Sequence, residues 1–348
     1  MKRILLVGSG HAHTVLLSAL VEKPLHGARV ALVAPAAKQL YSGMLPGIVA
    51  GHYRRYQAEI DVARLCEAAY VEFVEGAVTA LDARERSVAL ADGREMTYDV
   101  LSLNVGSRPD TSVPGATEHA LLAKPFDRFL RELSLAPRIA LAGGGAAGAE
   151  LAMALRHRGS AVTLYSEKSG FEPNFDRRIT AALRSRGVDY RPGMPITALE
   201  PGPVVVSGTA RQSFDLVIWT TGPAALRWLS QSGLQTDGQG FVLVDPTLRS
   251  VSHPEVFAVG DCATVEDAPH RKSGLYSVRH GETLAINLHH LIDGKPLKVY
   301  RPQKRGLVLL SCGDRTAIAN RGRWTAEGWW VWRWKDWIDR RWVKSLSI

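Results

Sequence analysis

The sequence predicts an α/β protein made of two doubly wound domains, each a parallel sheet with helices on both faces. The main observation is a repeated unit of buried strand, glycine-rich turn, helix and second buried strand. Its two copies lie about 135 residues apart. The length of 348 residues suits two domains of ordinary size. The hydrophobic content of 46% and charged content of 22% are typical of a globular chain without long disorder.

The first copy occupies the start of the chain. Residues 3–7 read RILLV, the uninterrupted apolar run of a buried parallel strand. A glycine turn, a helical stretch over 14–21 and a second strand at 29–33 follow. This order of elements opens a doubly wound fold.

The second copy begins with RIALA at 138–142, a glycine turn, and a helix that ends near Gly159. Its second strand is expected at 161–165. Between the copies, residues 71–103 alternate strand-like runs with turn signals. We interpret them as a small antiparallel excursion that ends in a strand at 100–103.

Both turns predict dinucleotide binding. The second copy carries G-x-G-x-x-G in the required context, between a strand and a helix. These glycines permit a tight turn, close approach of backbone to a pyrophosphate and close packing of helix on strand, while the helix N-terminus faces the anion. The first copy has His13 at the third position, so a side chain must be accommodated there. The glycines are Gly143, Gly145 and Gly148 in the second copy, and Gly8 and Gly10 in the first.

The residue after the second strand decides how the ribose is recognised. The first copy has Ala34-Pro35 there and lacks the expected acid. The second copy has Glu167, which suits the ribose hydroxyls of NADH. Nearby Lys168, Arg177 and Arg178 suit the 2′-phosphate of NADPH instead. We favour NADH and keep NADPH as the alternative.

The C-terminal 28 residues are basic and rich in tryptophan. They carry +4 of the net charge of +9 and seven of the nine tryptophans, which indicates a membrane surface rather than nucleic acid. At helical spacing an apolar arc faces a polar side, as in a helix lying on anionic lipid. The alternative is a helix packed on the body or on a second subunit of a homodimer. The arc comprises Trp330, Val331, Trp334, Trp337, Ile338 and Trp342, and Arg333, Lys335, Asp336, Asp339, Arg340 and Lys344 lie mostly opposite.

The cysteines and apolar runs indicate the cellular setting. Cys66, Cys262 and Cys312 are far apart and form no CxxC, so neither a disulfide framework nor a metal site is expected. No apolar run approaches the roughly 20 residues of a membrane span. The opening MKRILLV is better interpreted as a buried strand than as a signal peptide. We expect a cytoplasmic protein, peripheral on the inner face of the cell membrane if the tail binds lipid.

Together these features resemble the flavin-dependent pyridine nucleotide oxidoreductases, the superfamily of glutathione reductase and type II NADH dehydrogenase. TTGP at 220–223 resembles the motif that closes the NADH domain, and VFAVGDCA at 256–263 resembles the second FAD fingerprint. YSGMLPGIVAGHY at 41–53, GHAH at 10–13 and KDWIDR at 335–340 resemble a type II NADH dehydrogenase-like branch sometimes fused to selenide, water dikinase. The chain is too short to carry that kinase.

The resemblance implies FAD and a nicotinamide cofactor, and it assigns site residues. Asp261 would bond the ribityl chain of the flavin, residues 41–46 would line its ring, and Glu150 would sit near the nicotinamide. For Asp261 the alternative is a helix N-cap, and for Glu150 a first-turn acid favoured by the helix dipole. The predicted cofactor-binding residues are Gly8, Gly10, His11, Ala12, Tyr41, Ser42, Met44, Pro46, Gly106, Gly143, Gly145, Gly148, Glu167, Gly222, Gly260 and Asp261.

The electron acceptor stays open at this point. No cysteine pair lies beside the expected flavin, so an internal dithiol relay is excluded. The glutamine-bearing quinone motif of type II NADH dehydrogenases is replaced by residues 273–280, where Tyr276, Arg279 and His280 are candidate acceptor-site residues. The predicted catalytic residues are Glu150, Tyr276 and His280. His280 is equally interpreted as a structural histidine.

We therefore expect hydride transfer from NADH to FAD and then electron transfer to a small acceptor, with a membrane quinone as the candidate. The alternatives are a soluble NAD(P)H-dependent reductase of a selenium or sulfur compound or partner protein, and a non-enzymatic flavin-binding redox sensor. The expected FAD domain comprises 1–125 and 246–305, the NAD(P)H domain 126–245, and the C-terminal region 306–348.

Overall fold

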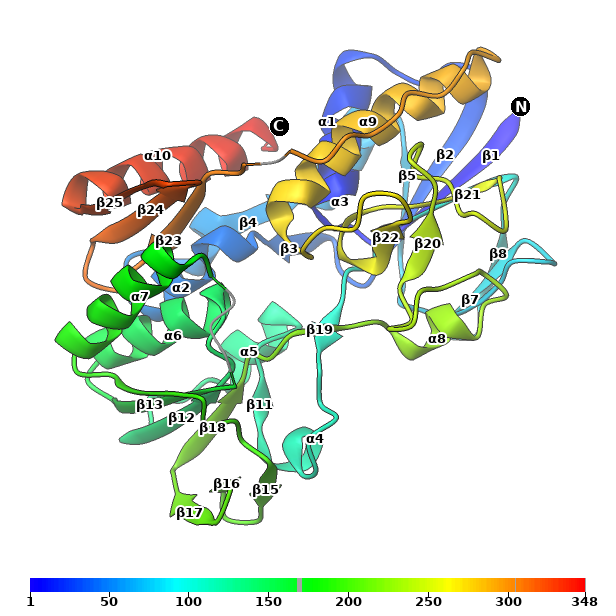
Figure 1. Ribbon diagram of the computed structural model, residues 1–348. Helices are drawn as coiled ribbons and strands as arrows, with labels where there is room; N and C mark the ends of the chain where they lie inside the picture. Colours follow the sequence, from blue (N-terminus) through cyan, green and yellow to red (C-terminus); the bar gives the residue numbers. More distant parts are fainter. Residues whose placement is uncertain (168–170, 304, 348) are drawn as a thin grey trace.

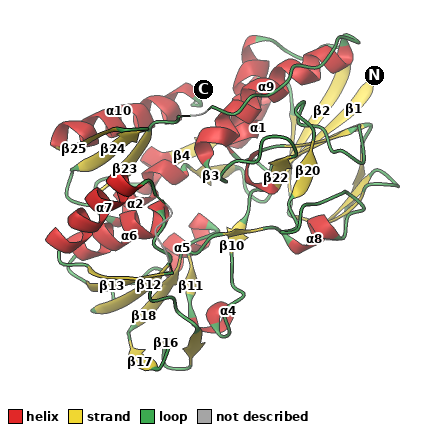
Figure 2. Cartoon of the chain, viewed as in Figure 1, coloured by secondary structure: helices red, strands yellow, loops and turns green. Residues whose placement is uncertain are grey.

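The chain folds into two sheet-based units and a smaller C-terminal unit (Figure 1). The computed structural model describes residues 1–167, 171–303 and 305–347. Each larger unit is a five-stranded parallel sheet. Figure 2 shows helices and strands alternating through both units. The predicted fold class is confirmed.

The first sheet contains the first repeat copy at its centre. Its strands, in sheet order, are β21 (Val256–Ala258), β9 (Val100–Leu103), β1 (Lys2–Val7), β2 (Ala28–Ala34) and β5 (Glu72–Glu75). The last four residues of β1 and all of β9 are buried, as the apolar runs predict. Residues 71–103 were predicted to form a small antiparallel insertion. Its first strand, β5, and its last strand, β9, belong to this parallel sheet.

The second sheet has the same plan around the second copy. Its strands, in sheet order, are β11 (Leu121–Leu122), β18 (Leu216–Trp219), β12 (Arg138–Ala142), β13 (Ala161–Ser166) and β14 (Asp189–Pro192). In each sheet the strand before the glycine turn lies between the strand after the helix and a later strand. The repeat read from the sequence is therefore a repeat of structure.

Each unit also carries a three-stranded antiparallel sheet. The strands are β6 (Val78–Asp82), β7 (Ser87–Leu90) and β8 (Glu95–Thr97) in the first unit, and β15 (Ala198–Glu200), β16 (Val204–Ser207) and β17 (Ala210–Ser213) in the second. The two larger units also contain short strand pairs: β3 (Lys38–Leu40) with β4 (Glu59–Asp61), β10 (Arg108–Pro109) with β19 (Pro223–Ala224), and β20 (Val242–Val244) with β22 (Ala263–Val265). The β10–β19 pair lies where the chain crosses between the two units.

Two helices of the first unit, α1 (His11–Glu22) and α9 (Gly274–Ile292), pack closely against each other. A Cβ atom at Gly281 would lie 2.5 Å from the Ala12 carbonyl oxygen, so glycine permits the close approach of α9 to α1. The helices are α1 (His11–Glu22), α2 (Leu45–Val49), α3 (Val62–Ala68), α4 (Ala116–His119), α5 (Phe126–Glu132), α6 (Ala146–His157), α7 (Pro173–Ser185), α8 (Arg227–Ser230), α9 (Gly274–Ile292) and α10 (Trp329–Ser345), with 3₁₀ turns η1 (Ser42–Met44), η2 (Arg55–Ala58) and η3 (Gly260–Cys262). None of the described helices is both long and apolar enough to span a membrane.

The C-terminal unit places α10 over an antiparallel sheet of β23 (Val308–Ser311), β24 (Ala317–Arg321) and β25 (Trp324–Gly328). In Figure 1 this unit lies above α6 and α7 and beside α2. The helix was predicted from the sequence, whereas the three strands before it were not.

Candidate active site

The first glycine turn is shaped by Asn104, a residue that the sequence analysis missed. A Cβ atom at Gly8 would lie 2.5 Å from the Asn104 backbone oxygen, and one at Gly10 would lie 2.6 Å from its Oδ1. Gly8 also has a φ of +88°, which favours glycine. Both positions therefore require glycine, and the turn leads directly into the N-terminus of α1.

His13 occupies the third glycine position without blocking the turn. Its Nδ1 lies 2.6 Å from the Gly8 carbonyl oxygen and its Nε2 lies 2.8 Å from Ser102 Oγ. A carbonyl only accepts, so Nδ1 donates and Nε2 accepts from the serine hydroxyl. Burial lowers the pKa of His13 to about 4, which keeps the ring neutral. The imidazole thus braces the turn from within.

Asn104 also links this turn to the Gly260-Asp261 element. Its Oδ1 accepts a hydrogen bond from the His13 backbone N–H at 3.1 Å, and its Nδ2 donates to the Val259 carbonyl at 2.9 Å. One buried amide thus fixes the spacing between the two predicted FAD fingerprints. Its only sequence signal is its place after the strand at 100–103.

The carboxylate of Asp261 has one oxygen held by protein and one left over. Oδ2 accepts hydrogen bonds from Ser107 Oγ at 3.3 Å and from Lys124 Nζ at 3.5 Å. Oδ1 is buried and has no hydrogen-bond partner within the described structure. Because a buried acceptor is rarely left unpaired, Oδ1 suits a ligand hydroxyl. The residues present therefore fit FAD, for which Asp261 is predicted to hold the ribityl chain.

A candidate cofactor site, called the cradle below, is formed by His11, Tyr41, Gly106 and Asp261. His11 interacts electrostatically with Asp261, and its ring lies 5.5 Å from that of Tyr41. Burial lowers the pKa of His11. No protein atom of the described chain lies within 4 Å of a Cβ atom built at Gly106, so the backbone there faces open space. The structure thus brings His11, Tyr41 and Asp261 together.

Residues 41–46, which were predicted to line the flavin ring, are only partly accessible to a ligand. Tyr41 and Ser42 are partly exposed, whereas Met44 and Pro46 are buried. Ala12, in the first turn of α1, is also fully buried. Ala12 and Met44 belong to the hydrophobic core of the first unit. Direct contact of Ala12, Met44 and Pro46 with a cofactor stays a prediction.

Tyr276 and His280 lie on α9 beside a cavity of about 580 Å³. Tyr276 lines it and stacks on His270, with ring centroids 4.2 Å apart. His280 is fully buried: its Nδ1 accepts from the Gly260 N–H at 3.0 Å and its Nε2 lies 3.1 Å from His270 Nε2. Burial lowers its pKa to about 3. His280 therefore supports the backbone of Gly260, and its role toward an acceptor stays a prediction.

The second glycine turn has a closed side and an open side. Cβ atoms at Gly143 and Gly148 would lie 2.7 Å and 1.8 Å from the carbonyl oxygens of Thr220 and Gly143, whereas one at Gly145 would meet no described protein atom within 4 Å. Gly222 is open in the same way. The third glycine thus packs helix on strand, and the second leaves its backbone open, as a dinucleotide site requires. Binding of a dinucleotide at Gly145 stays a prediction.

Glu150 lies on α6 where the second unit meets the C-terminal sheet. Its Oε1 accepts a hydrogen bond from the Ser311 backbone N–H at 2.7 Å. Burial raises its pKa to about 7, although Lys335 and the Ser311 bond act in the opposite direction. Glu150 also acts electrostatically on Tyr41, so the structure brings these two predicted site residues near each other.

The residues predicted to distinguish NADH from NADPH have different surroundings. Glu167 is exposed just after β13, while Lys168 lies outside the described residues. Arg178 donates to Thr325 Oγ1 at 2.8 Å, and Arg177 donates to Asn174 Oδ1 at 2.6 Å. Both arginines thus have partners on or beyond α7.

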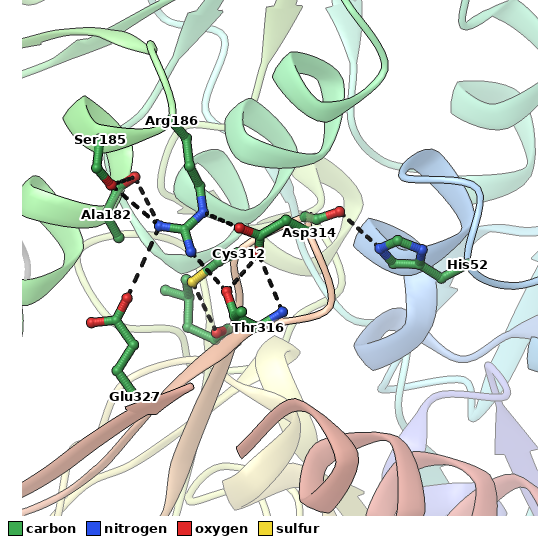
Figure 3. Close-up of polar contacts among 10 residues, drawn as sticks. His52, Ala182, Ser185, Arg186, Cys312, Asp314, Thr316 and Glu327 are labelled. Atoms are coloured by element: carbon green, nitrogen blue, oxygen red, sulfur yellow. Dashed lines mark hydrogen bonds and ion pairs between the residues drawn. The ribbon is translucent and has the colours of Figure 1, made fainter. Parts of the chain in front are cut away.

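An arginine fastens the C-terminal sheet to the second unit (Figure 3). Arg186, the C-cap residue of α7, donates to Asp314 Oδ2 at 3.0 Å and to Thr316 Oγ1 at 2.7 Å. On the other side, His52 Nε2 lies 2.8 Å from the Gly313 carbonyl oxygen. These contacts fix the loop after β23, the strand whose Ser311 holds Glu150.

Helix α10 corrects one expectation from the sequence. Lys335 and Asp339, expected on the polar side, are buried and form an ion pair of 2.6 Å. Lys335 Nζ also donates to the Gly43 carbonyl at 2.7 Å, and the Tyr41 hydroxyl donates to Asp339 Oδ1 at 3.3 Å. The pair is tolerated because these bonds use its remaining polar atoms.

The exposed side of α10 is correspondingly different from the expected one. Trp330 and Trp337, expected within an inward or lipid-facing apolar arc with Val331, are 44% and 57% exposed, whereas Val331 is buried. The helix therefore packs on the protein through one face and presents tryptophan on another. Helical periodicity alone did not separate these two faces.

A family model for pyridine nucleotide-disulphide oxidoreductases matches residues 2–282. The chain belongs to this family. The pyridine nucleotide-disulphide oxidoreductases include flavoenzymes, and this chain is an FAD-dependent oxidoreductase with FAD and NADH as its cofactors. All three cysteines lie in the described part of the chain, and each is buried and free.

Two relatives and one solved structure illustrate which members of the family the chain resembles. An NADH dehydrogenase-like protein of Mycobacterium tuberculosis is 29% identical over 66% of each chain. A type II NADH:quinone oxidoreductase of Haemophilus influenzae is 23% identical over 92% of this chain and 87% of that one. The sulfide:quinone oxidoreductase of Aquifex aeolicus has the same fold, with a TM-score of 0.84, 15% identity, and coverage of 99% and 91%. The predicted type II NADH dehydrogenase-like branch is confirmed.

Proposed function

We propose that the chain is an NADH:quinone oxidoreductase that acts at the cytoplasmic surface of a membrane. The observation that carries this proposal is the double role of α10. Its inner face holds Tyr41 and Gly43 of the candidate flavin segment, and its outer face exposes tryptophan and basic side chains. A lipid-soluble acceptor would thus be reached from the side of the molecule that contacts lipid. The similarity to the Haemophilus influenzae quinone oxidoreductase supports the same conclusion.

The cysteines support direct transfer to a small acceptor. Burial raises the pKa of Cys66 and Cys312 to about 12 and that of Cys262 to about 11. Thiols with such values are not reactive thiolates near neutral pH.

The overall reaction converts NADH, one proton and a quinone into NAD⁺ and a quinol.

The residues have distinct roles in this proposal. Bound FAD supplies the chemistry that accepts a hydride and passes on two electrons. The open turn at Gly145 and the exposed Glu167 bind NADH, and Asp261 orients the cofactor through its free oxygen. Glu150, with a pKa of about 7, holds a proton in a partly buried position near neutral pH. Its neighbour Ser311 keeps one carboxyl oxygen fixed.

The outer face of α10 suits anionic lipid. Trp329, Trp330 and Trp337 are 65%, 44% and 57% exposed. A hollow of about 530 Å³ on this helix is lined by Trp332, Arg333, Asp336, Trp337, Arg340, Arg341 and Lys344. Indole rings favour the interface of a bilayer, and basic side chains favour anionic headgroups.

The test measures NADH oxidation by the flavin-loaded protein on ubiquinone-containing vesicles, made with or without phosphatidylglycerol. We expect binding and turnover on the anionic vesicles. The variant Trp337→Ser/Arg341→Gln should lose most of both while still reducing a water-soluble dye. The matched control Tyr70→Ser/Arg211→Gln removes one exposed aromatic ring and one exposed arginine elsewhere and should behave as the wild type. Dye reduction without any quinone turnover would refute the proposal in favour of a soluble reductase.

A further inference from the structure

A lysine side chain from the second unit contacts the predicted flavin site of the first unit. Lys124 lies inside the range 1–125 expected for the FAD domain, but it follows β11, an edge strand of the second sheet, whereas Asp261 follows β21 of the first sheet. Lys124 Nζ lies 3.5 Å from Asp261 Oδ2 and 3.3 Å from Ser107 Oγ. The unit that binds NADH thus supplies a positive charge to the carboxylate of the unit that binds FAD.

The two oxygens of the Asp261 carboxylate have different surroundings. Oδ2 is held by Lys124 and Ser107, while Oδ1 is buried and without a partner among the described residues. The side chain of Asp261 is 18% exposed and that of Lys124 is 38% exposed. Lys124 therefore lies at the mouth of the cradle and Asp261 lies deeper.

The other groups around this carboxylate do not replace the lysine. His11 interacts with both Asp261 and Lys124, and burial lowers its pKa, so it is mostly neutral near pH 7. Ser107 is uncharged. Lys272 also interacts electrostatically with Asp261, but its ammonium group donates to Thr264 Oγ1 at 2.8 Å and to the Ala263 carbonyl rather than to Asp261. Among the described residues, Lys124 is thus the cation that contacts the Asp261 carboxylate.

We propose that Lys124 is a positioning residue of the flavin site: it fixes Asp261 and, by compensating its charge, raises the reduction potential of the bound flavin. This inference rests on the proposed function, because it takes Asp261 as a flavin-binding residue. Electrons that enter the flavin bring negative charge, and an uncompensated carboxylate nearby opposes their arrival. Because the lysine comes from the NADH-binding unit, the arrangement of the two units sets this compensation.

The test is an anaerobic redox titration of the FAD-saturated protein against a dye of known potential. For Lys124→Met we expect an equilibrium constant for two-electron flavin reduction lower by on the order of tenfold, since unit charges at close range interact by a few kcal/mol at most near a protein surface. A tenfold change corresponds to a potential about 30 mV more negative. Asp261→Asn should shift the potential in the opposite direction, and the double variant should return toward the wild type.

Two controls separate charge compensation from general damage. Lys124→Arg keeps the cation and should keep the potential. Lys295→Met removes the same charge from an exposed ion pair with Asp293, and should leave the potential unchanged. FAD dissociation constants, measured on the same variants, report the positioning role separately from the potential.

The outcomes distinguish this inference from the proposed function. If Lys124→Met binds FAD and titrates at the wild-type potential, or if both single variants shift it in the same direction, the inference is wrong and the proposed function is untouched. If the wild-type protein binds no FAD, or bound flavin is not reduced by NADH, the proposed function itself fails.

Discussion

The buried ion pair of α10 gives the sharpest prediction for stability. Lys335 and Asp339 have side chains only 9% and 6% exposed, and burial raises the pKa of Asp339 despite its partner. Replacing Lys335 with Met leaves the carboxylate buried without its cation and removes the hydrogen bond to the Gly43 carbonyl. Removing one partner of a buried pair costs about 3–5 kcal/mol.

The assay is thermal unfolding of the flavin-loaded protein, followed by circular dichroism. A loss of about 3 kcal/mol or more should lower Tm by roughly 6 °C or more, at about 2 °C per kcal/mol for a large domain. Arg340→Met is the matched control, because Arg340 pairs with Asp336 one turn along the same helix with side chains 45% and 23% exposed. An exposed pair contributes about 0–1 kcal/mol, so Tm should barely change.

A second variant tests the cause. Lys335→Met/Asp339→Asn removes both charges and keeps an acceptor for the Tyr41 hydroxyl, so it should recover much of the lost stability. If Lys335→Met is no more harmful than Arg340→Met, the buried pair does not fasten α10, and the reasoning about its inner face is refuted.

Three further predictions concern the second unit. The pKa of Glu150 is raised from 4.5 to about 7, so its neutral form stabilises the fold below pH 4.5 and this contribution is lost as pH rises through 7. Urea titrations should show the unfolding free energy of the wild type falling by up to about 3 kcal/mol relative to that of Glu150→Gln between pH 5 and 8. Unfolding free energies that change in parallel with pH in the two proteins would contradict this prediction. Gly148→Ala should lower Tm because its Cβ would lie 1.8 Å from a backbone oxygen, whereas Gly145→Val should keep Tm and weaken NADH binding at least tenfold by fluorescence titration; equal Tm losses would contradict the assignment. Glu167→Ala should raise the Kd for NADH severalfold and leave that for NADPH unchanged or lower; an unchanged NADH affinity would remove Glu167 from the site.

Much of the fold and part of the site followed from local patterns. The glycine turns, the central strands of both sheets and the Gly260-Asp261 element are contiguous in sequence, so their spacing carries their meaning. Asn104 and Lys124 were missed because their roles depend on residues more than 100 positions away. Single polar residues after a strand carry no distinguishing signal.

The C-terminal unit shows the limit of periodicity. The pattern predicted a helix, and α10 is present, but Lys335 and Asp339 read as solvent-facing because the sequence does not reveal that they pair beneath the helix. The three strands before α10 were missed as well. Their tight turns at Gly313 and Gly322, both with positive φ, were the available signal.

The measurement that tests the central claim most directly is anaerobic mixing of the purified protein with NADH, followed by addition of quinone in vesicles, while the visible flavin band is recorded. The account predicts that the band bleaches rapidly with NADH and returns when quinone is added. A flavin that stays oxidised with NADH, or one that bleaches but is not reoxidised by quinone, would contradict it.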